Sequence, residues 1–185
     1  RRKKILATTL LRALGLSSNY EIFKALYTIE KAEVSKANFK KLDGKFLAHD
    51  VVNKEKNEII LPSATKLTPE NLEFLLGQEI KEIEIVVMDD EDLALCNTIE
   101  REPYRNTEDA RIAIYKRIRP GDPPTPESAK DLIDKMFFDV QRYDLGKVGR
   151  FMMNRKLNMK ESLDAAILQL GDVVCVMKAL LGLRN

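Results

Sequence analysis

The chain has 185 residues, with 31 Lys and Arg against 29 Asp and Glu, so its formal net charge is +2. This length suits one domain, or one domain with a small insert. A hydrophobic content of 44% and a charged content of 32% are typical of a folded protein and exclude intrinsic disorder, and no apolar run is long enough to span a membrane. Cys96 and Cys175 both lie in apolar stretches, and two cysteines alone cannot make a metal framework, so we expect two buried, reduced thiols.

Helix caps and apolar periodicity predict six helices in chain order. The predicted helices cover residues 7–14, 19–34, 69–77 and 107–117, a segment that begins at Pro126, and a segment after Asp172. Three side chains are predicted to cap helix N-termini: Ser18 (with Glu21 three residues on), Thr68 and Thr125. A proline follows each of the two threonines, at the helical position where proline is best tolerated.

The spacing of apolar residues changes between residues 44 and 66, where two short β-rich runs flank the polar turn 53–57. This pattern predicts a hairpin with a long loop, and residues 83–90 are a third strand candidate. The sequence therefore predicts an α+β fold: a mainly helical domain made of residues 1–43 and 105–185, with a β-containing subdomain inserted at residues 44–104.

Charge is distributed unevenly along the chain. Residues 79–110 hold eleven acids and three bases, whereas residues 115–160 hold eleven bases and six acids. A basic stretch interrupted by Tyr and Phe is compatible with nucleic-acid contact, and also with an ordinary solvated surface.

The residues that most often perform catalysis form no recognisable constellation here. The sequence lacks a phosphate-cradling loop and a dinucleotide fingerprint. His49 has no Ser or Cys partner nearby, and the adjacent acids 89–92 would alternate between faces rather than converge on one ion, so a solvated loop is predicted there. Residues 146–149 have the G-x-x-G spacing of an RNA-binding module but lack its context, and we interpret them as two turns. No catalytic, cofactor or metal-binding residue is predicted in this chain.

The segment 116–125 has the most specific physical character. Arg119 precedes Pro120 and is therefore directed into an extended conformation. Gly121 then turns the chain, and Pro123 and Pro124 stiffen it until Thr125 caps the next helix. The sequence predicts a rigid exposed loop with Lys116, Arg117 and Arg119 at its base, suited to placing cations against an anion. An ordinary stiff connector between two helices would have the same pattern.

Residues 114–157, IYKRIRPGDPPTPESAKDLIDKMFFDVQRYDLGKVGRFMMNRKL, closely resemble a stretch of the bacterial RNA polymerase β subunit that contains RPG-[ED]-PPT, FF, RYDL and VGR in this order. The opening RRKK…AT…LRAL (residues 1–14) and the final LRN (residues 183–185) resemble the same family, and the likeness covers nearly the whole chain in order. The chain starts with Arg1 rather than Met, and we interpret the start as a cut inside a longer protein.

This resemblance implies the region of β called the lobe, which forms one wall of the DNA cleft. The RPG-x-PP loop would be the gate loop that helps close the cleft around downstream and promoter DNA. The residues expected to approach DNA are Arg1, Arg2, Lys116, Arg117, Arg119 and Arg142. The implied partners are DNA, the β′ and α subunits, σ factor and transcription regulators, without a membrane, in the cytoplasm at the nucleoid. The catalytic Mg²⁺ of the family belongs to β′, so no cofactor is expected here.

Three alternatives of other classes stay open at this point. The lobe could act mainly as a protein-docking module for σ factor or regulators, with DNA contact incidental. The chain could be a free-standing helical nucleic-acid binder, or a stand-alone enzyme, for which the sequence offers no constellation of residues.

Overall fold

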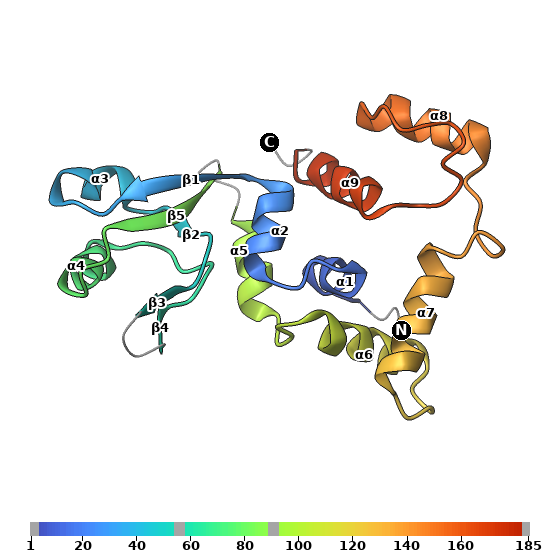
Figure 1. The fold of residues 1–185 in the computed structure, drawn as a ribbon, viewed down its shortest axis with the longest axis horizontal. Helices are drawn as coiled ribbons and strands as arrows, with labels where there is room; N and C mark the ends of the chain where they lie inside the picture. Colours follow the sequence, from blue (N-terminus) through green and yellow to red (C-terminus); the bar gives the residue numbers. More distant parts are fainter. Residues whose placement is uncertain (1–3, 54–57, 89–92, 183–185) are drawn as a thin grey trace. The chain divides into compact units, whose positions relative to one another are not determined.

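The computed structural model describes residues 4–53, 58–88 and 93–182, and Figure 1 labels its helices and strands. The chain divides into two compact units. Arg1–Ser17 and Tyr104–Asn185 form the first, called here the helical unit, and Ser18–Pro103 form the second, called the sheet unit. Helices and a small antiparallel sheet together confirm the predicted α+β class.

The helical unit is built on three helices that enclose a small apolar core. These are α1 (Ala7–Leu14), α6 (Thr107–Ile118) and α7 (Pro126–Phe137). Their buried residues are Ala13, Leu14, Ala110, Ile114 and Ile133. Gly15 ends α1 with a φ of 129°, a conformation that other residues rarely adopt, as the sequence predicts for a C-cap.

Two further helices complete the helical unit: α8 (Gly146–Leu157) and α9 (Leu170–Gly182). Leu170 and Val173 of α9 pack against the core formed by α1, α6 and α7. The interpretation of residues 146–149 as two turns is wrong, because Gly146 starts α8 with a φ of 64° and Gly149 lies inside the helix.

The sheet unit combines short helices with two small antiparallel sheets. Its helices are α2 (Asn19–Leu26), the 3-10 helix η1 (Lys36–Asn38), α3 (Phe39–Leu42), α4 (Pro69–Gly77) and α5 (Ala94–Arg101). Its strands are β1 (Thr28–Glu33), β2 (Phe46–Leu47), β3 (Val51–Asn53), β4 (Glu58–Leu61) and β5 (Glu82–Val87). One sheet has the order β1-β5-β2, and the other pairs β3 with β4. The core of this unit lies between the first sheet and α4 and consists of Val34, Leu42, Leu47, Leu67, Leu72, Leu75, Ile83 and Ile85.

The helix predicted over residues 19–34 is wrong beyond Leu26. The chain turns at Tyr27 and continues as β1, which pairs along its length with β5, so that Ile29 lies opposite Val86. Thr28 and Ile29 are β-branched and favour a strand locally, and the pairing with a distant strand decides between the two patterns. The predicted hairpin is confirmed for β3 and β4, but β2 pairs with β5 instead.

The predicted boundary between residues 43 and 44 falls inside the sheet unit, because β1 pairs with β5 and both belong to that unit. The predicted boundary between residues 104 and 105 lies one residue from the observed one, which separates Pro103 from Tyr104. Helix α5 was not predicted.

All three predicted N-caps are confirmed. The Ser18 hydroxyl accepts a hydrogen bond from the Glu21 backbone N–H at 3.2 Å, and the Glu21 carboxylate accepts one in return from the Ser18 N–H at 3.0 Å. The Thr68 hydroxyl accepts from the Asn71 N–H at 3.3 Å. Such caps satisfy backbone donors that a helix N-terminus leaves unpaired, which is why the starts of these helices could be predicted from local sequence.

Candidate nucleic-acid interface

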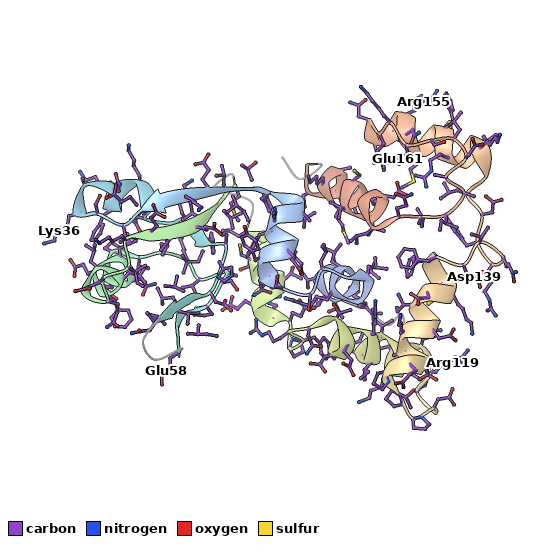
Figure 2. All side chains as sticks on the ribbon, viewed as in Figure 1. Lys36, Glu58, Arg119, Asp139, Arg155 and Glu161 are labelled. Atoms are coloured by element: carbon purple, nitrogen blue, oxygen red, sulfur yellow. The ribbon has the colours of Figure 1, made fainter. Side chains whose placement is uncertain are left out.

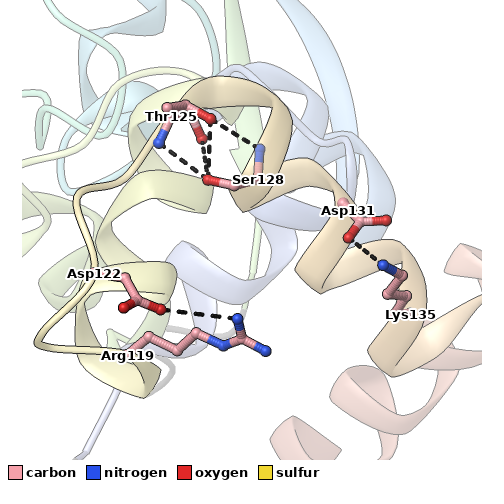
Figure 3. A network of polar contacts seen from close by, with 6 residues as sticks. All are labelled: Arg119, Asp122, Thr125, Ser128, Asp131 and Lys135. Atoms are coloured by element: carbon pink, nitrogen blue, oxygen red, sulfur yellow. Dashed lines mark hydrogen bonds and ion pairs between the residues drawn. The ribbon is translucent and has the colours of Figure 1, made fainter.

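A braced loop connects α6 to α7. The N–H of Arg119 still donates to the Tyr115 carbonyl at 2.8 Å, so Arg119 continues directly from the last turn of α6. At the other end Thr125 and Ser128 form a reciprocal cap: the Ser128 N–H donates to the Thr125 hydroxyl at 3.2 Å, and the Thr125 N–H donates to the Ser128 hydroxyl at 3.0 Å (Figure 3). Both ends of the loop are therefore fixed by hydrogen bonds.

Replacing Thr125 by alanine should lower the free energy of unfolding by about 1 kcal/mol, because it removes the hydroxyl that caps α7. Thr125→Ser keeps an acceptor at the same position and is the matched control. Chemical denaturation of the 185-residue chain measures both variants. Equal losses for alanine and serine would contradict the capping role.

Two exposed arginines face one pocket beside this loop. Arg119 and Arg142 both line a pocket of about 240 Å³ in the surface of the helical unit. Their side chains are 57% and 63% exposed. The sequence predicted both as DNA-approaching residues, and the structure brings these two together.

Neither arginine is held tightly by an internal partner. The Arg119 guanidinium lies 3.8 Å from the Asp122 carboxylate across the loop (Figure 3), and the Arg142 guanidinium lies 3.3 Å from the Asp139 carboxylate. Exposed pairs of this kind contribute about 0–1 kcal/mol each. Both guanidinium groups can therefore turn toward an external anion at little cost.

Much of the pocket wall comes from one face of α7. The residues of α7 that line it are Ser128, Asp131, Leu132, Lys135 and Met136, and Tyr115 of α6 completes the lining. The Lys135 ammonium lies 2.5 Å from the Asp131 carboxylate (Figure 3). Three cationic groups and one carboxylate thus line the pocket, and the carboxylates of Asp122 and Asp139 lie beside its two arginines.

Sequence reasoning missed Lys135 as part of this site. Residues 128, 131, 132, 135 and 136 follow the i, i+3, i+4, i+7, i+8 spacing of one helix face. The sequence shows that these residues share one face of α7, but it does not show that this face borders a pocket with Arg119 and Arg142.

The other predicted cations are not brought into the pocket. Lys116 and Arg117 lie exposed in the last turn of α6, and the Arg117 guanidinium donates to the Lys4 backbone carbonyl. Neither lines the pocket that contains Arg119. Arg1 and Arg2 lie outside the described residues, and so do the acids 89–92.

Arg150, the arginine of the motif VGR, is buried in an ion pair. Arg150 and Asp172 are inaccessible to solvent, and the Arg150 Nη1 donates to the Asp172 carboxylate at 2.7 Å. The same guanidinium donates to the backbone carbonyls of Ala165 at 2.9 Å and Ile167 at 2.7 Å. The hydrogen bond with Asp172 raises the pKa of Arg150 above its usual value, against the opposing effect of desolvation. This arginine joins α8 to the connector that leads into α9.

The parts of the chain that the structure describes offer no arrangement for catalysis. Within residues 4–53, 58–88 and 93–182, no group of three or more His, Cys, Asp or Glu side chains is placed to hold a metal ion. His49 Nδ1 lies 2.8 Å from the Asp50 carbonyl, and its ring packs edge-on against Tyr20. Cys96 is buried as predicted, whereas Cys175 is only half-buried, and neither forms a disulfide. Among the described helices, none is long and apolar enough to cross a membrane.

Comparison with known proteins places the chain among the large subunits of multisubunit RNA polymerases. It is 38% identical over its whole length to the DNA-directed RNA polymerase subunit beta of Protochlamydia amoebophila, 36% to that of Chlamydia felis and 34% to that of Flavobacterium johnsoniae. The chain spans only 15–16% of the length of these relatives. The family model described as RNA polymerase Rpb2, domain 2, matches residues 88–185. The chain belongs to this family, and the predicted resemblance to the bacterial β subunit is confirmed.

Proposed function

We propose that this chain is the lobe of a bacterial RNA polymerase β subunit and forms one wall of the cleft that holds DNA during transcription. The loop 119–125 would be its gate loop, which positions promoter and downstream DNA without reacting with it. The observation that supports this proposal best is the shared pocket of two exposed guanidinium groups, that of Arg119 at the start of the braced loop and that of Arg142 in the connector between α7 and α8.

The physical role proposed here is positioning by charge. Cations at fixed places follow a phosphate backbone and set the register of a duplex without reading its sequence. A few arginines alone bind DNA weakly, with a dissociation constant of roughly 10⁻⁴ M or poorer at physiological salt. In a polymerase many such contacts act together, so that each gains from the high effective concentration created by the others.

The remaining functions are assigned to parts of the enzyme outside this chain. Nucleotidyl transfer and its Mg²⁺ would belong to β′, with no cofactor held by these 185 residues. The partners would be DNA, the β′ and α subunits, σ factor and transcription regulators, in the cytoplasm at the nucleoid. The exposed guanidinium groups of Arg119 and Arg142 favour DNA as their direct partner, because guanidinium groups form charge-assisted hydrogen bonds with phosphate oxygens.

The test is the lifetime of the open promoter complex formed by the assembled polymerase with Arg119→Ala and Arg142→Ala together. We expect the lifetime to fall about tenfold, which corresponds to roughly 1.4 kcal/mol for the two contacts. The slope of log lifetime against log salt should also become less steep by up to about 1.8, because each lost phosphate contact to duplex DNA contributes about 0.9.

Lys36→Ala with Lys40→Ala is the matched control, since it removes two exposed cations from the sheet unit. This control should leave both the lifetime and the salt slope unchanged. An unaltered lifetime in the arginine double variant would contradict the proposal, and a shorter lifetime with an unaltered salt slope would indicate a protein contact instead.

A further inference from the structure

One face of α8 is apolar and exposed. Val148, Phe151 and Met152 are 78%, 51% and 37% exposed, and their spacing of three and four residues places them on the same side of the helix. The opposite side contains Arg150, which is fully buried, and Asn154, whose amide donates to the Glu161 carbonyl at 2.7 Å. The buried side therefore holds the connector to α9, while the apolar side is largely open to solvent within the part of the chain that the structure describes.

All charged residues of α8 are basic. The sequence of α8, GKVGRFMMNRKL, contains no acid. Arg155 and Lys156 are exposed at its C-terminal end, and Arg155 is labelled on α8 in Figure 2. Lys147 at the other end lies 3.0 Å from the Asp164 carboxylate, but both side chains are more than three-quarters exposed. A complementary surface would have an apolar centre and carboxylates at its edge.

The composition of the face favours a protein over a nucleic acid. Bases stack on aromatic rings, and Phe151 is the only aromatic residue among the three apolar ones. Val148, which is the most exposed, is aliphatic and gains from burial against other apolar side chains. An exposed apolar patch with a polar rim marks a protein interaction site.

We propose that this face of α8 docks onto an acid-rimmed apolar surface of the same β-type polypeptide, in a region beyond these 185 residues. The inference rests on the proposed function in one respect, namely that the chain works within a polymerase subunit. The relatives are more than six times as long as the region that the chain matches, so most of their polypeptide is available to supply this surface. The basic end of α8 sets the orientation of the contact.

The test places the photoreactive residue p-benzoylphenylalanine at position 148 in the assembled polymerase. Irradiation in the absence of DNA should give an adduct within the β-type polypeptide, mapped by mass spectrometry to a segment that combines apolar and acidic residues. Arg155→Glu should lower the adduct yield at least fivefold, because it places a carboxylate against the acidic rim. Lys130→Glu, a matched charge reversal of an exposed residue on α7, should leave the yield unchanged.

An adduct to another subunit or to a second copy of the chain would overturn the proposal, and so would the absence of an adduct. This result is independent of the one at Arg119 and Arg142. The adduct can form in a polymerase whose open-complex lifetime does not respond to those arginines, so failure of one proposal is distinguishable from failure of the other.

Discussion

Replacing Arg150 by alanine should lower the free energy of unfolding of the helical unit by about 3 kcal/mol. The substitution leaves the Asp172 carboxylate inaccessible to solvent without its cation, and it removes the donors of two backbone carbonyls in the connector. The Asp172 carboxylate would keep the hydrogen bond that it accepts from the Gln169 N–H at 2.8 Å. The lower end of the range for broken buried pairs therefore applies.

The loss of stability should be concentrated in α8, α9 and the connector between them. Hydrogen exchange measured on the 185-residue chain should show lost protection in residues 146–182, because the connector is released when its carbonyls lose their donors. Arg155→Ala is the matched control: it removes an exposed arginine from the same helix, and its effect should stay below about 0.5 kcal/mol. A similar loss for both variants would mean that the buried pair contributes nothing specific.

The position of Arg150 also shows what could not be predicted from sequence. In the motif VGR it stands among other bases and has the same local pattern as an exposed arginine. Its burial depends on Asp172, which lies 22 residues further along the chain. A pairing over this distance has no signature in hydrophobic period or in caps, because both of these describe neighbours on a single element.

In the sheet unit, too, a contact between distant parts of the sequence decided the structure against the local pattern. Ile22, Leu26 and Ile29 follow a helical interval, so the pattern predicts one long helix through residue 34. The helix ends at Leu26 because β1 finds hydrogen-bond partners along all of β5, which the local pattern does not contain. The capped starts of α2, α4 and α7 were predicted correctly, because their hydrogen bonds join residues that are close in the sequence.

The candidate site was predictable in part. The prolines and the cap identify the rigid loop from the sequence alone, and the family resemblance singled out Arg119 and Arg142 together. Their common pocket depends on how α6 and α7 pack, and Lys135 joins them only through that packing. A role in DNA binding for these residues stays a prediction until the polymerase variants are measured.

Leu72→Ala should lower the free energy of unfolding of the sheet unit by about 3 kcal/mol, the second large effect expected in this chain. Leu72 is fully buried in α4 and belongs to a core that also contains Leu47, Leu67 and Leu75, each without solvent exposure. Truncation removes apolar contacts and leaves a cavity that the short strands β2 and β5 close only in part. Chemical denaturation, combined with hydrogen exchange of the β5 amides, measures the effect.

Phe74→Ala is the matched control on the same helix, because Phe74 is 51% exposed two residues from Leu72. Loss of its larger side chain should cost less than about 1 kcal/mol, since much of the ring is in water in the folded chain as well as in the unfolded chain. A larger loss for Phe74→Ala than for Leu72→Ala would contradict the placement of the core beneath α4. The ratio of the two effects therefore tests which face of α4 stabilises the sheet unit, independently of any role in transcription.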